Sequence, residues 1–347
     1  MKTFRIGYVG FLPHPNFLAT CALDPALEVV HIPLEVSVGE AVQALSACHG
    51  YYVMAARDEL PAPLHVHAEL LGKLPNLLMA ASYGAGYDTC VPQDCTEAGV
   101  LLVNQAGGNA EGVAEHAVGM MLACLKRMPE AHAAMIAGTA RNRAMLLGRE
   151  LRGRVVGLVG GGNVGARVTE IIRAAFGCRV LICDPFMDAA SIAALGAEKV
   201  EMAALLAQTD VISLHCPLTP ATRGLIDAAA FTGMKPGVVF VTTARGSIHD
   251  EAALLAALNS GQVASAGLDV WEVEPPPTDH PLLHHPAVIA SQHTAGVTQE
   301  SRANITRIAA LAFSELAAGR MPPRVVNPGV TPRFAARYAA AFGPLTV

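Results

Sequence analysis

Short apolar runs alternate with helical patterns along the first hundred residues of the chain. The apolar runs have the length of strands, and amphipathic stretches such as Val38–Ala47 and Val66–Lys73 separate them. The predicted strands are Phe4–Val9, Leu27–Ile32, Tyr51–Ala55, Leu77–Ala81 and Val100–Val103. Short buried strands separated by helices are typical of a parallel sheet that is covered on both faces. This part of the chain therefore predicts an α/β domain.

A second block of the same kind follows a long, mostly apolar helical pattern from about Asn109 to Met128. Its predicted strands are Val155–Val159, Arg179–Cys183, Val211–His215, Val238–Thr242, Ser265–Leu268 and Val288–Ala290. Helices are predicted between them at Asn163–Phe176, Ala189–Leu195, Met202–Gln208, Asp227–Phe231 and Glu251–Ser260. Strands at this spacing suit one complete doubly wound sheet. A last helix, Gln299–Ala318, leads into a Pro-rich tail.

Composition narrows the class of protein. The 347 residues can bury two cores, and 52% of them are hydrophobic. No uninterrupted apolar run reaches the roughly 18 residues that predict a membrane span. The formal net charge of −5 leaves no basic surplus for a nucleic-acid partner. We therefore expect an α/β protein that binds neither membrane nor nucleic acid.

Cysteine and histidine placement gives no sign of a metal site. The eight cysteines contain no Cys-x-x-Cys pair, which favours free thiols in a reducing compartment. His280, His284 and His285 lie in a Pro-rich loop without carboxylates at metal-ligand spacing. The N-terminus runs directly into the first predicted strand, without the apolar core and cleavage site of a signal peptide. These features predict a cytoplasmic protein without a bound metal.

A Gly-rich turn directly follows the predicted strand Val155–Val159 and opens the next helix. It reads Gly160-Gly161-Gly162-Asn163-Val164-Gly165. Gly160 permits the tight turn, Gly162 lets the backbone approach a pyrophosphate, and Gly165 lets the helix pack closely on the strand. Free N–H groups at the helix N-terminus attract an anion. We therefore expect this turn, including Asn163-Val164, to bind a dinucleotide.

Asp184 closes the next predicted strand, 19 residues after Gly165. An acid at this place accepts hydrogen bonds from the adenosine ribose hydroxyls and repels a 2′-phosphate, which favours NAD over NADP. The alternative is an ordinary Gly-rich turn followed by a helix-capping acid. Strand, turn, helix and acid in this order favour the cofactor site.

Three polar residues follow three of the later strands. Arg245, Glu274 and His293 come shortly after the strands that end at residues 242, 268 and 290. Since loops at the carboxyl ends of parallel strands converge, we expect these side chains to meet. Arginine can bind carboxylate and carbonyl oxygens, imidazole can exchange a proton, and a neighbouring carboxylate stabilises the charged imidazole. This combination suits hydride transfer between a 2-hydroxy acid and a 2-oxo acid.

With these motifs in place, nearly the whole chain resembles the D-isomer-specific 2-hydroxyacid dehydrogenase family, which includes phosphoglycerate, glycerate and D-lactate dehydrogenases and glyoxylate/hydroxypyruvate reductases. Segments similar to that family include Ser82–Asp88, Asn109–His116 and His215–Gly224. The resemblance implies two doubly wound parallel-sheet domains. A Rossmann NAD-binding domain (105–295) would be inserted into a flavodoxin-like substrate domain (1–104 and 296–347). It also implies a homodimer that uses the helix and loop at 109–151.

The resemblance also implies roles for individual residues. His293 would act as general acid and base, with Glu274 keeping it charged and Arg245 orienting the carbonyl. The substrate contacts that it implies are Tyr83, Gly84, Ala85 and Arg57, with backbone amides near Gly84 and Ala85 holding the carboxylate. Besides the Gly-rich turn and Asp184, the cofactor contacts that it implies are Cys216, Pro217, Thr243, Ala244, Asp269 and Gly296.

Several points stay open on sequence alone. Arg57 either meets a distal substrate group or pairs with Asp58 or Glu59. Gln292 stands where relatives usually have Pro, and it either alters the loop or offers a polar contact to substrate. His116, on an apolar helix, is expected to take a capping or core hydrogen-bond role rather than to act in catalysis.

Two other functions compete with the leading one. Formate or phosphite oxidation uses the same fold, but formate dehydrogenases carry Gln where Glu274 stands. An NAD-sensing regulator of this fold would show no turnover of any 2-oxo acid. The chain ends soon after the returning helix, so we expect no regulatory domain and no serine-type feedback through one.

Overall fold

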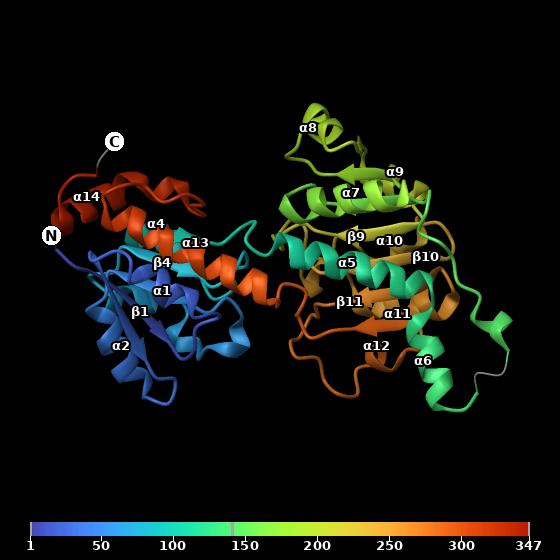
Figure 1. Cartoon of the computed structure of the whole chain (residues 1–347), viewed down its shortest axis with the longest axis horizontal. Coiled ribbons are helices and arrows are strands. Elements are labelled where there is room, and N and C mark those ends of the chain that lie inside the picture. The colour runs from blue at the N-terminus through green and yellow to red at the C-terminus, as the bar shows by residue number, and fades with distance from the viewer. Residues whose placement is uncertain (1, 140–141, 346–347) are drawn as a thin grey trace. The chain divides into compact units, whose positions relative to one another are not determined.

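Two parallel sheets organise the chain in the computed structural model, which describes residues 2–139 and 142–345. Each sheet belongs to a unit of its own (Figure 1). The discontinuous unit comprises Met1–Asn109 and Val297–Val347, and the inserted unit comprises Ala110–Gly296. The boundaries predicted from sequence were 104/105 and 295/296, and the substrate and cofactor roles of the two parts remain predictions.

The discontinuous unit carries a five-stranded parallel sheet in the order β2-β1-β3-β4-β5. Its strands are β1 (Phe4–Val9), β2 (Leu27–Ile32), β3 (Gly50–Val53), β4 (Met79–Ser82) and β5 (Leu101–Val103). Its α-helices are α1 (Asn16–Cys21), α2 (Val38–Ser46), α3 (Ala68–Lys73), α4 (Pro92–Ala98), α13 (Gln299–Ala317) and α14 (Thr331–Phe342). Strands β3 and β4 are buried along their whole length, as central strands of a doubly covered sheet are.

The returning helix α13 completes the core of this unit. Its Phe313 lies edge-on to Phe17 of α1 and to Tyr52 of β3, with ring centroids 6.2 and 6.4 Å apart. Gly50 in β3 makes room for this ring, because a Cβ at that position would collide with Phe313. The C-terminal segment therefore belongs to the same core as the N-terminal strands.

The inserted unit carries a seven-stranded parallel sheet in the order β12-β11-β10-β9-β6-β7-β8. Its strands are β6 (Val155–Val159), β7 (Arg179–Cys183), β8 (Glu198–Lys199), β9 (Val211–Leu214), β10 (Val238–Thr242), β11 (Val263–Leu268) and β12 (Val288–Ala290). Its α-helices are α5 (Ala110–Leu125), α6 (Met128–Ile136), α7 (Asn163–Phe176), α8 (Ala189–Ala194), α9 (Met202–Gln208), α10 (Ala228–Thr232), α11 (Glu251–Ser260) and α12 (Pro281–His284).

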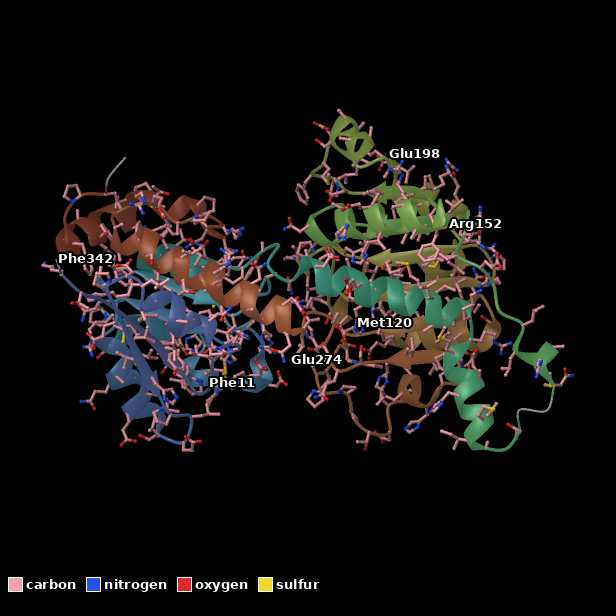
Figure 2. All side chains as sticks on the ribbon, viewed as in Figure 1. Phe11, Met120, Arg152, Glu198, Glu274 and Phe342 are labelled. Carbon is pink, nitrogen blue, oxygen red and sulfur yellow. The ribbon has the colours of Figure 1, made fainter. Side chains whose placement is uncertain are left out.

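Helix α5 packs on β10, β11 and β12. Met120 (Figure 2) occupies the space that a side chain at Gly267 of β11 would need, since a Cβ there would lie 2.8 Å from the Met120 Cβ. Most of the helix is buried, in agreement with its almost continuous apolar pattern. This contact fixes the helix against the strands whose ends carry the predicted catalytic residues.

The predicted fold class is confirmed, and the differences are local. The helix expected to reach Met128 ends at Leu125, because Arg127 adopts a left-handed backbone with φ of 53° and α6 begins with Pro129 in its first turn. The expected Pro-rich tail instead contains α14, whose Phe334 and Tyr338 are buried in the core. Across residues 2–139 and 142–345, no helix combines the length and apolar character needed to cross a bilayer.

Candidate active site

The Gly-rich turn joins β6 to α7. Gly160 has φ of 101°, and a Cβ there would lie 2.9 Å from the backbone of His215 and Cys216. A Cβ on Gly165 would collide with the carbonyl oxygen of Gly160. Gly162, the N-cap of α7, faces open space, and no described side chain caps the helix. The first N–H groups of α7 are therefore available to an anion.

Asp184 follows β7 directly, and its carboxylate is fixed beside this turn. Its Oδ2 accepts a hydrogen bond from the Gly161 N–H at 2.9 Å, and its Oδ1 accepts from the N–H groups of Phe186 and Met187 at 2.8 and 3.3 Å. Asp184 is partly exposed. Because Oδ2 keeps a second lone pair, the carboxylate can still accept a hydrogen bond from a ribose hydroxyl.

Other predicted cofactor contacts lie at the carboxyl ends of neighbouring strands. Cys216 and Pro217 come after β9, Thr243 and Ala244 follow β10, and Gly296 is the last residue of the inserted unit. Thr243 Oγ1 is buried and has no hydrogen-bond partner among the described residues. Such an atom is expected where a ligand completes the hydrogen bonding. The uncapped helix, the fixed acid and this hydroxyl fit a dinucleotide.

His293 and Glu274 form a direct pair. His293 Nδ1 lies 2.8 Å from Glu274 Oε2, and Glu274 Oε1 accepts a hydrogen bond from the Trp271 N–H at 3.0 Å. Burial alone would raise the pKa of Glu274, but the hydrogen bonds from His293 and Trp271 and the charges of His293 and Arg245 hold it below its usual value. The carboxylate is therefore ionised at neutral pH and can stabilise a charged imidazole.

Arg245 lies in the loop that follows β10. Its Nη1 donates to the carbonyl of Ala244 at 2.6 Å, and its charge lowers the pKa of Glu274. The next residue, Gly246, lets this loop touch the loop after β11, because a Cβ there would collide with the backbone of Trp271. The structure thus brings all three predicted catalytic residues to one edge of the inserted sheet.

The loop that carries His293 is tied to Asp269, which is fully buried. The Asp269 carboxylate accepts hydrogen bonds from Ser291 Oγ at 2.6 Å, from the Thr294 N–H at 2.8 Å and from the Ala295 N–H at 3.0 Å. Its carbonyl accepts from the His293 N–H at 2.7 Å. His293 itself has φ of 49°, a left-handed backbone that is uncommon outside glycine. Asp269 therefore holds this loop, whether or not it also contacts the nicotinamide as predicted.

The predicted carboxylate site lies in the discontinuous unit, in the turn after β4. The carbonyls of Gly84 and Ala85 accept hydrogen bonds from the Gln105 N–H at 2.9 Å and from Asn104 Nδ2 at 2.8 Å. Their own N–H groups donate to no described residue, and Gly84 faces open space where a Cβ would be. A turn with fixed carbonyls and available N–H groups suits a carboxylate.

Tyr83 and Arg57 lie next to this turn. The Tyr83 hydroxyl donates to the carbonyl of Phe11 at 2.7 Å, and the two rings meet edge-on with centroids 6.4 Å apart. Arg57 is exposed, and its Nε donates to the carbonyl of Asp88 at 2.9 Å. This bond fixes Arg57 beside the turn, and its predicted role toward a distal substrate group stays a prediction, as does a pair with Asp58 or Glu59.

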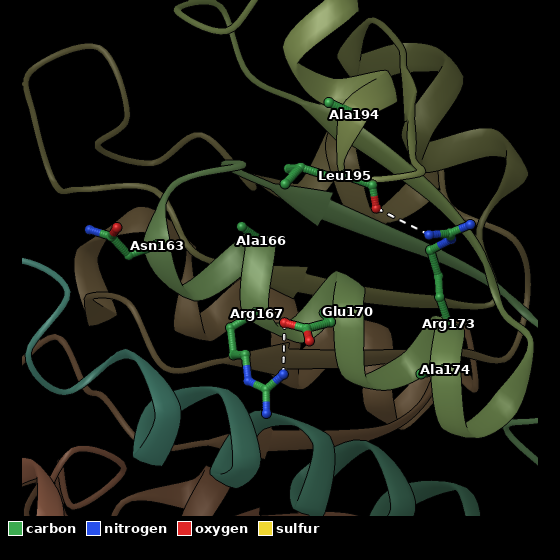
Figure 3. Close-up of a pocket in the computed structure, with 8 residues that line it drawn as sticks. All are labelled: Asn163, Ala166, Arg167, Glu170, Arg173, Ala174, Ala194 and Leu195. Atoms are coloured by element: carbon green, nitrogen blue, oxygen red, sulfur yellow. Dashed lines mark hydrogen bonds and ion pairs between the residues drawn. The ribbon is translucent and has the colours of Figure 1, made fainter.

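A surface hollow of about 640 Å³ lies between α7 and α8 (Figure 3). Arg167 on its wall is paired with Glu170 at 2.7 Å and with Glu111 of α5 at 2.6 Å. Asn163 of the Gly-rich turn stands at one end of it, whereas none of the three predicted catalytic residues lines it. The hollow adjoins the cofactor turn and is separate from the His293 pair.

Three histidines that sequence reasoning did not assign to the site have notable environments. The ring nitrogens of His215 and His249 are buried without a hydrogen-bond partner among the described residues, and burial lowers the pKa of each to about 4. His116 makes the hydrogen bond expected of it, with Nε2 lying 3.0 Å from Ser291 Oγ. Only the folded structure reveals these environments, because nothing in the local sequence distinguishes them.

Comparison with known proteins identifies relatives over most of the chain. Residues 118–295 match the family model described as D-isomer specific 2-hydroxyacid dehydrogenase, NAD binding domain. D-3-phosphoglycerate dehydrogenase of Archaeoglobus fulgidus is 38% identical over 268 residues, which are 77% of this chain and 50% of that protein. Glyoxylate reductase of Aeropyrum pernix is 35% identical over 76% of this chain and 80% of its own length. The chain thus spans about half the length of the phosphoglycerate dehydrogenases it matches.

Solved structures agree with this result. A glyoxylate reductase from Paecilomyes thermophila has a TM-score of 0.83 at 27% identity and covers 94% of this chain and 99% of its own. D-mandelate dehydrogenase of Rhodotorula graminis has a TM-score of 0.81 at 27% identity, with 93% and 97% covered. Both chains align over nearly their full length with the two-sheet architecture described above.

Proposed function

Because the chain belongs to the D-isomer specific 2-hydroxyacid dehydrogenase family, and its inserted unit corresponds to the NAD-binding domain of that family, we propose that it interconverts a small D-2-hydroxy acid and its 2-oxo acid. The observation that carries this proposal is the 2.8 Å pair of His293 and an ionised Glu274 at the sheet edge that also bears the Gly-rich turn. Such a pair can store a proton and release it to an oxygen.

In the reductive direction C2 of the 2-oxo acid would accept the hydride that NADH supplies when it is bound. Protonated His293 gives its proton to the carbonyl oxygen, and the product is the 2-hydroxy acid. Glu274 holds the imidazole in orientation and favours its charged form before the transfer. Arg245 orients and polarises the carbonyl through its guanidinium. In the oxidative direction His293 takes the hydroxyl proton as a base.

The substrate carboxylate is assigned to the Gly84 and Ala85 N–H groups, with Tyr83 beneath the turn. Their carbonyls are already bound by Asn104 and Gln105, which supports a turn whose amides point to a ligand. Arg57, anchored on the Asp88 carbonyl, would meet a distal group of a larger substrate.

We also propose that the enzyme is a cytoplasmic homodimer. Helix α6 has no buried residue, and the segment after it exposes further apolar side chains. The exposed fractions are 55% for Met128, 71% for Met135, 76% for Ile136, 73% for Met145 and 81% for Leu147. An apolar surface of this kind is typical of a protein interface. The free thiols of all eight cysteines suit a reducing compartment.

The proposal is tested by NADH oxidation with a panel of acids: glyoxylate, hydroxypyruvate, pyruvate, phenylpyruvate, 2-oxoglutarate and phosphohydroxypyruvate. The panel is repeated with NADPH, for which Asp184 predicts much weaker activity. No turnover of any acid would exclude the 2-oxoacid reductase and leave formate or phosphite oxidation and the NAD-sensing regulator.

His293→Ala should reduce kcat by at least about a hundredfold, because general acid catalysis typically contributes that much. NADH binding, measured by fluorescence titration, should be unchanged. His284→Ala, at an exposed position at the end of α12, serves as the control. Loss of NADH binding together with turnover would contradict the role of His293 as the proton donor.

A further inference from the structure

The hydrogen bonds behind His293 continue through Ser291 to helix α5. We propose that His116, Ser291 and Asp269 form a positioning chain that holds the His293 loop in its reactive backbone conformation. His116 and Ser291 are thereby positioning residues, since they act through Asp269 and the loop. The inference rests on the proposed function for the role of His293, but the hydrogen bonds among His116, Ser291 and Asp269 are a property of the fold.

The direction of each hydrogen bond in the chain follows from its acceptor. Ser291 Oγ lies 2.6 Å from Asp269 Oδ1, and an ionised carboxylate can only accept, so the hydroxyl donates. The hydroxyl has one hydrogen, and that hydrogen is committed to Asp269. His116 Nε2, 3.0 Å from the same oxygen, must therefore donate to it. The chain fixes His116 with a proton on Nε2.

Asp269, at the end of the positioning chain opposite His116, controls the backbone conformation at His293 and at the two residues that follow it. Asp269 accepts from the N–H groups of His293, Thr294 and Ala295 in addition to the Ser291 hydroxyl. Three consecutive N–H groups bound to one residue fix the left-handed turn at His293, whose φ is 49°. A fully buried carboxylate needs such donors, because an unpaired charge in the interior is strongly destabilising.

Ser291 also connects the two partners of the catalytic pair. Its carbonyl accepts a hydrogen bond from Trp271 Nε1 at 3.1 Å, and the Trp271 N–H donates to Glu274 at 3.0 Å. A shift of Ser291 would therefore move the supports of His293 and of Glu274 together. The 2.8 Å contact between them depends on both supports.

Helix α5 supplies a rigid anchor for this arrangement. His116 lies within the helix, which packs on β10, β11 and β12. Its side chain is partly exposed, with 28% of its surface accessible, and its Nε2 lies 3.8 Å from Asp269 Oδ1. The imidazole thus joins helix α5 to the Asp269–Ser291 pair.

Paired substitutions test the chain. Ser291→Ala should lower kcat about tenfold, the effect expected when a hydrogen bond to a charged group is lost from a positioned site. Ser291→Thr keeps the hydroxyl and should restore kcat to within about threefold of wild type. His116→Leu should lower kcat in the same way, and His116→Gln, which keeps an N–H donor, should lower it less. KM and the Kd of NADH should change little in all four variants.

Ser265→Ala is the matched control, because Ser265 is a buried serine of β11 whose side chain interacts with Cys124. It should leave kcat unchanged. Wild-type kcat in Ser291→Ala, or a loss that Ser291→Thr does not restore, would overturn the proposal. If Ser291→Ala lowers NADH affinity and Tm as well as kcat, the proposal is also overturned, since that result indicates general destabilisation.

A second measurement is independent of turnover. In ¹⁵N-histidine NMR spectra, assigned with His116→Gln, wild-type His116 should carry its proton on Nε2, and Ser291→Ala should remove this preference. The Nδ1 tautomer in the wild type would refute the chain even if the enzyme is active. Absence of turnover with the correct tautomer would refute the proposed function and leave the chain intact.

Discussion

Phe11 is unusual among the large apolar side chains of the discontinuous unit because Tyr83 holds it in place while its ring is exposed. Its carbonyl is bound by the Tyr83 hydroxyl, its ring meets the Tyr83 ring, and 48% of its surface is exposed. It follows β1, and Tyr83 follows β4, at the same end of the parallel sheet. The phenyl ring therefore lies next to the turn that is proposed to hold the substrate carboxylate.

Phe11→Ala should reduce selectivity for substrates with an apolar side chain. We expect kcat/KM for phenylpyruvate to fall about tenfold, a common loss for an apolar contact. Glyoxylate has no side chain, so its kcat/KM should stay the same. Leu23→Ala, in the same unit and 84% exposed, is the control. Equal losses for both acids would show that Phe11 supports the fold rather than selectivity.

Glu274→Gln tests the charge of the catalytic pair. The pKa of Glu274 is lowered by its contacts with His293, so the carboxylate is charged throughout the neutral range. Loss of this charge makes the protonated imidazole less favourable. The basic limb of the pH profile of reductive kcat/KM should move to lower pH by about one unit. A profile in the same place as that of the wild type would show that Glu274 does not control the protonation of His293.

Helix α6 behaves differently from the other helices of its unit. It has nine residues, none of them buried, and in Figure 1 it projects from the body of the unit. A helix this short is marginal in water, and tertiary packing of an apolar face usually supplies most of its stability. A second copy that covers Met135 and Ile136 would provide such packing.

The double substitution Met135→Asp and Ile136→Asp should convert the proposed dimer to a monomer, because two charges in an apolar interface are costly. Analytical ultracentrifugation measures the mass, and Leu23→Asp, an equally exposed apolar position, is the control. A wild-type protein that sediments as a monomer would refute the interface at once. A double variant that remains dimeric would place the interface elsewhere.

Elements were predictable from sequence where an apolar pattern and a boundary signal agree. Strands β6, β7 and β10 have the predicted bounds, and each is followed by a polar or glycine residue. Strand β8 was missed because Glu198-Lys199 is polar and makes only an edge pair with β7. The break after Leu125 was missed because Lys126, Arg127 and Met128 are all compatible with a helix, and no local pattern signals the left-handed backbone of Arg127.

The candidate site likewise contains residues that could be predicted from sequence and contacts that could not. Residues at strand ends, such as Arg245 and His293, could be placed because parallel strands bring their carboxyl ends together. The hydrogen bond from His116 to Ser291 joins residues 175 positions apart, and no local pattern encodes such a pairing. The left-handed backbone of His293 likewise depends on Asp269, which acts through the folded loop.

The described residues form three hydrophobic clusters, one in the discontinuous unit and two in the inserted unit, and no cluster draws residues from both units. In the inserted unit, His215 and His249 are neutral because burial lowers the pKa of each to about 4. In the unfolded chain a histidine titrates near 6.5. Between pH 6.5 and pH 4 these histidines are protonated in the unfolded state but stay neutral in the folded state. The free energy of unfolding therefore falls as the pH drops from about 6.5 to about 4.

Each of the two histidines should therefore cost roughly 3 kcal/mol of unfolding free energy across this range. His249→Leu removes one of the two contributions, so its stability should fall less steeply with decreasing pH than that of the wild type. Urea unfolding at pH 7, 6 and 5 measures the slope, with the exposed His132→Leu as control. An unchanged slope in His249→Leu would mean that His249 is already charged in the folded protein.

The contact between His116 and Ser291 has a consequence for how this protein can be cut and rejoined. His116 lies six residues after the start of the inserted unit and Ser291 five residues before its end, so the 3.0 Å contact keeps the two ends of that unit near each other. Six helical residues span about 9 Å, and five extended ones at most about 18 Å. The contact and these two arms limit the gap between the ends of residues 110–296, so the segment can be excised as one gene fragment and closed by a flexible linker long enough to span roughly 30 Å.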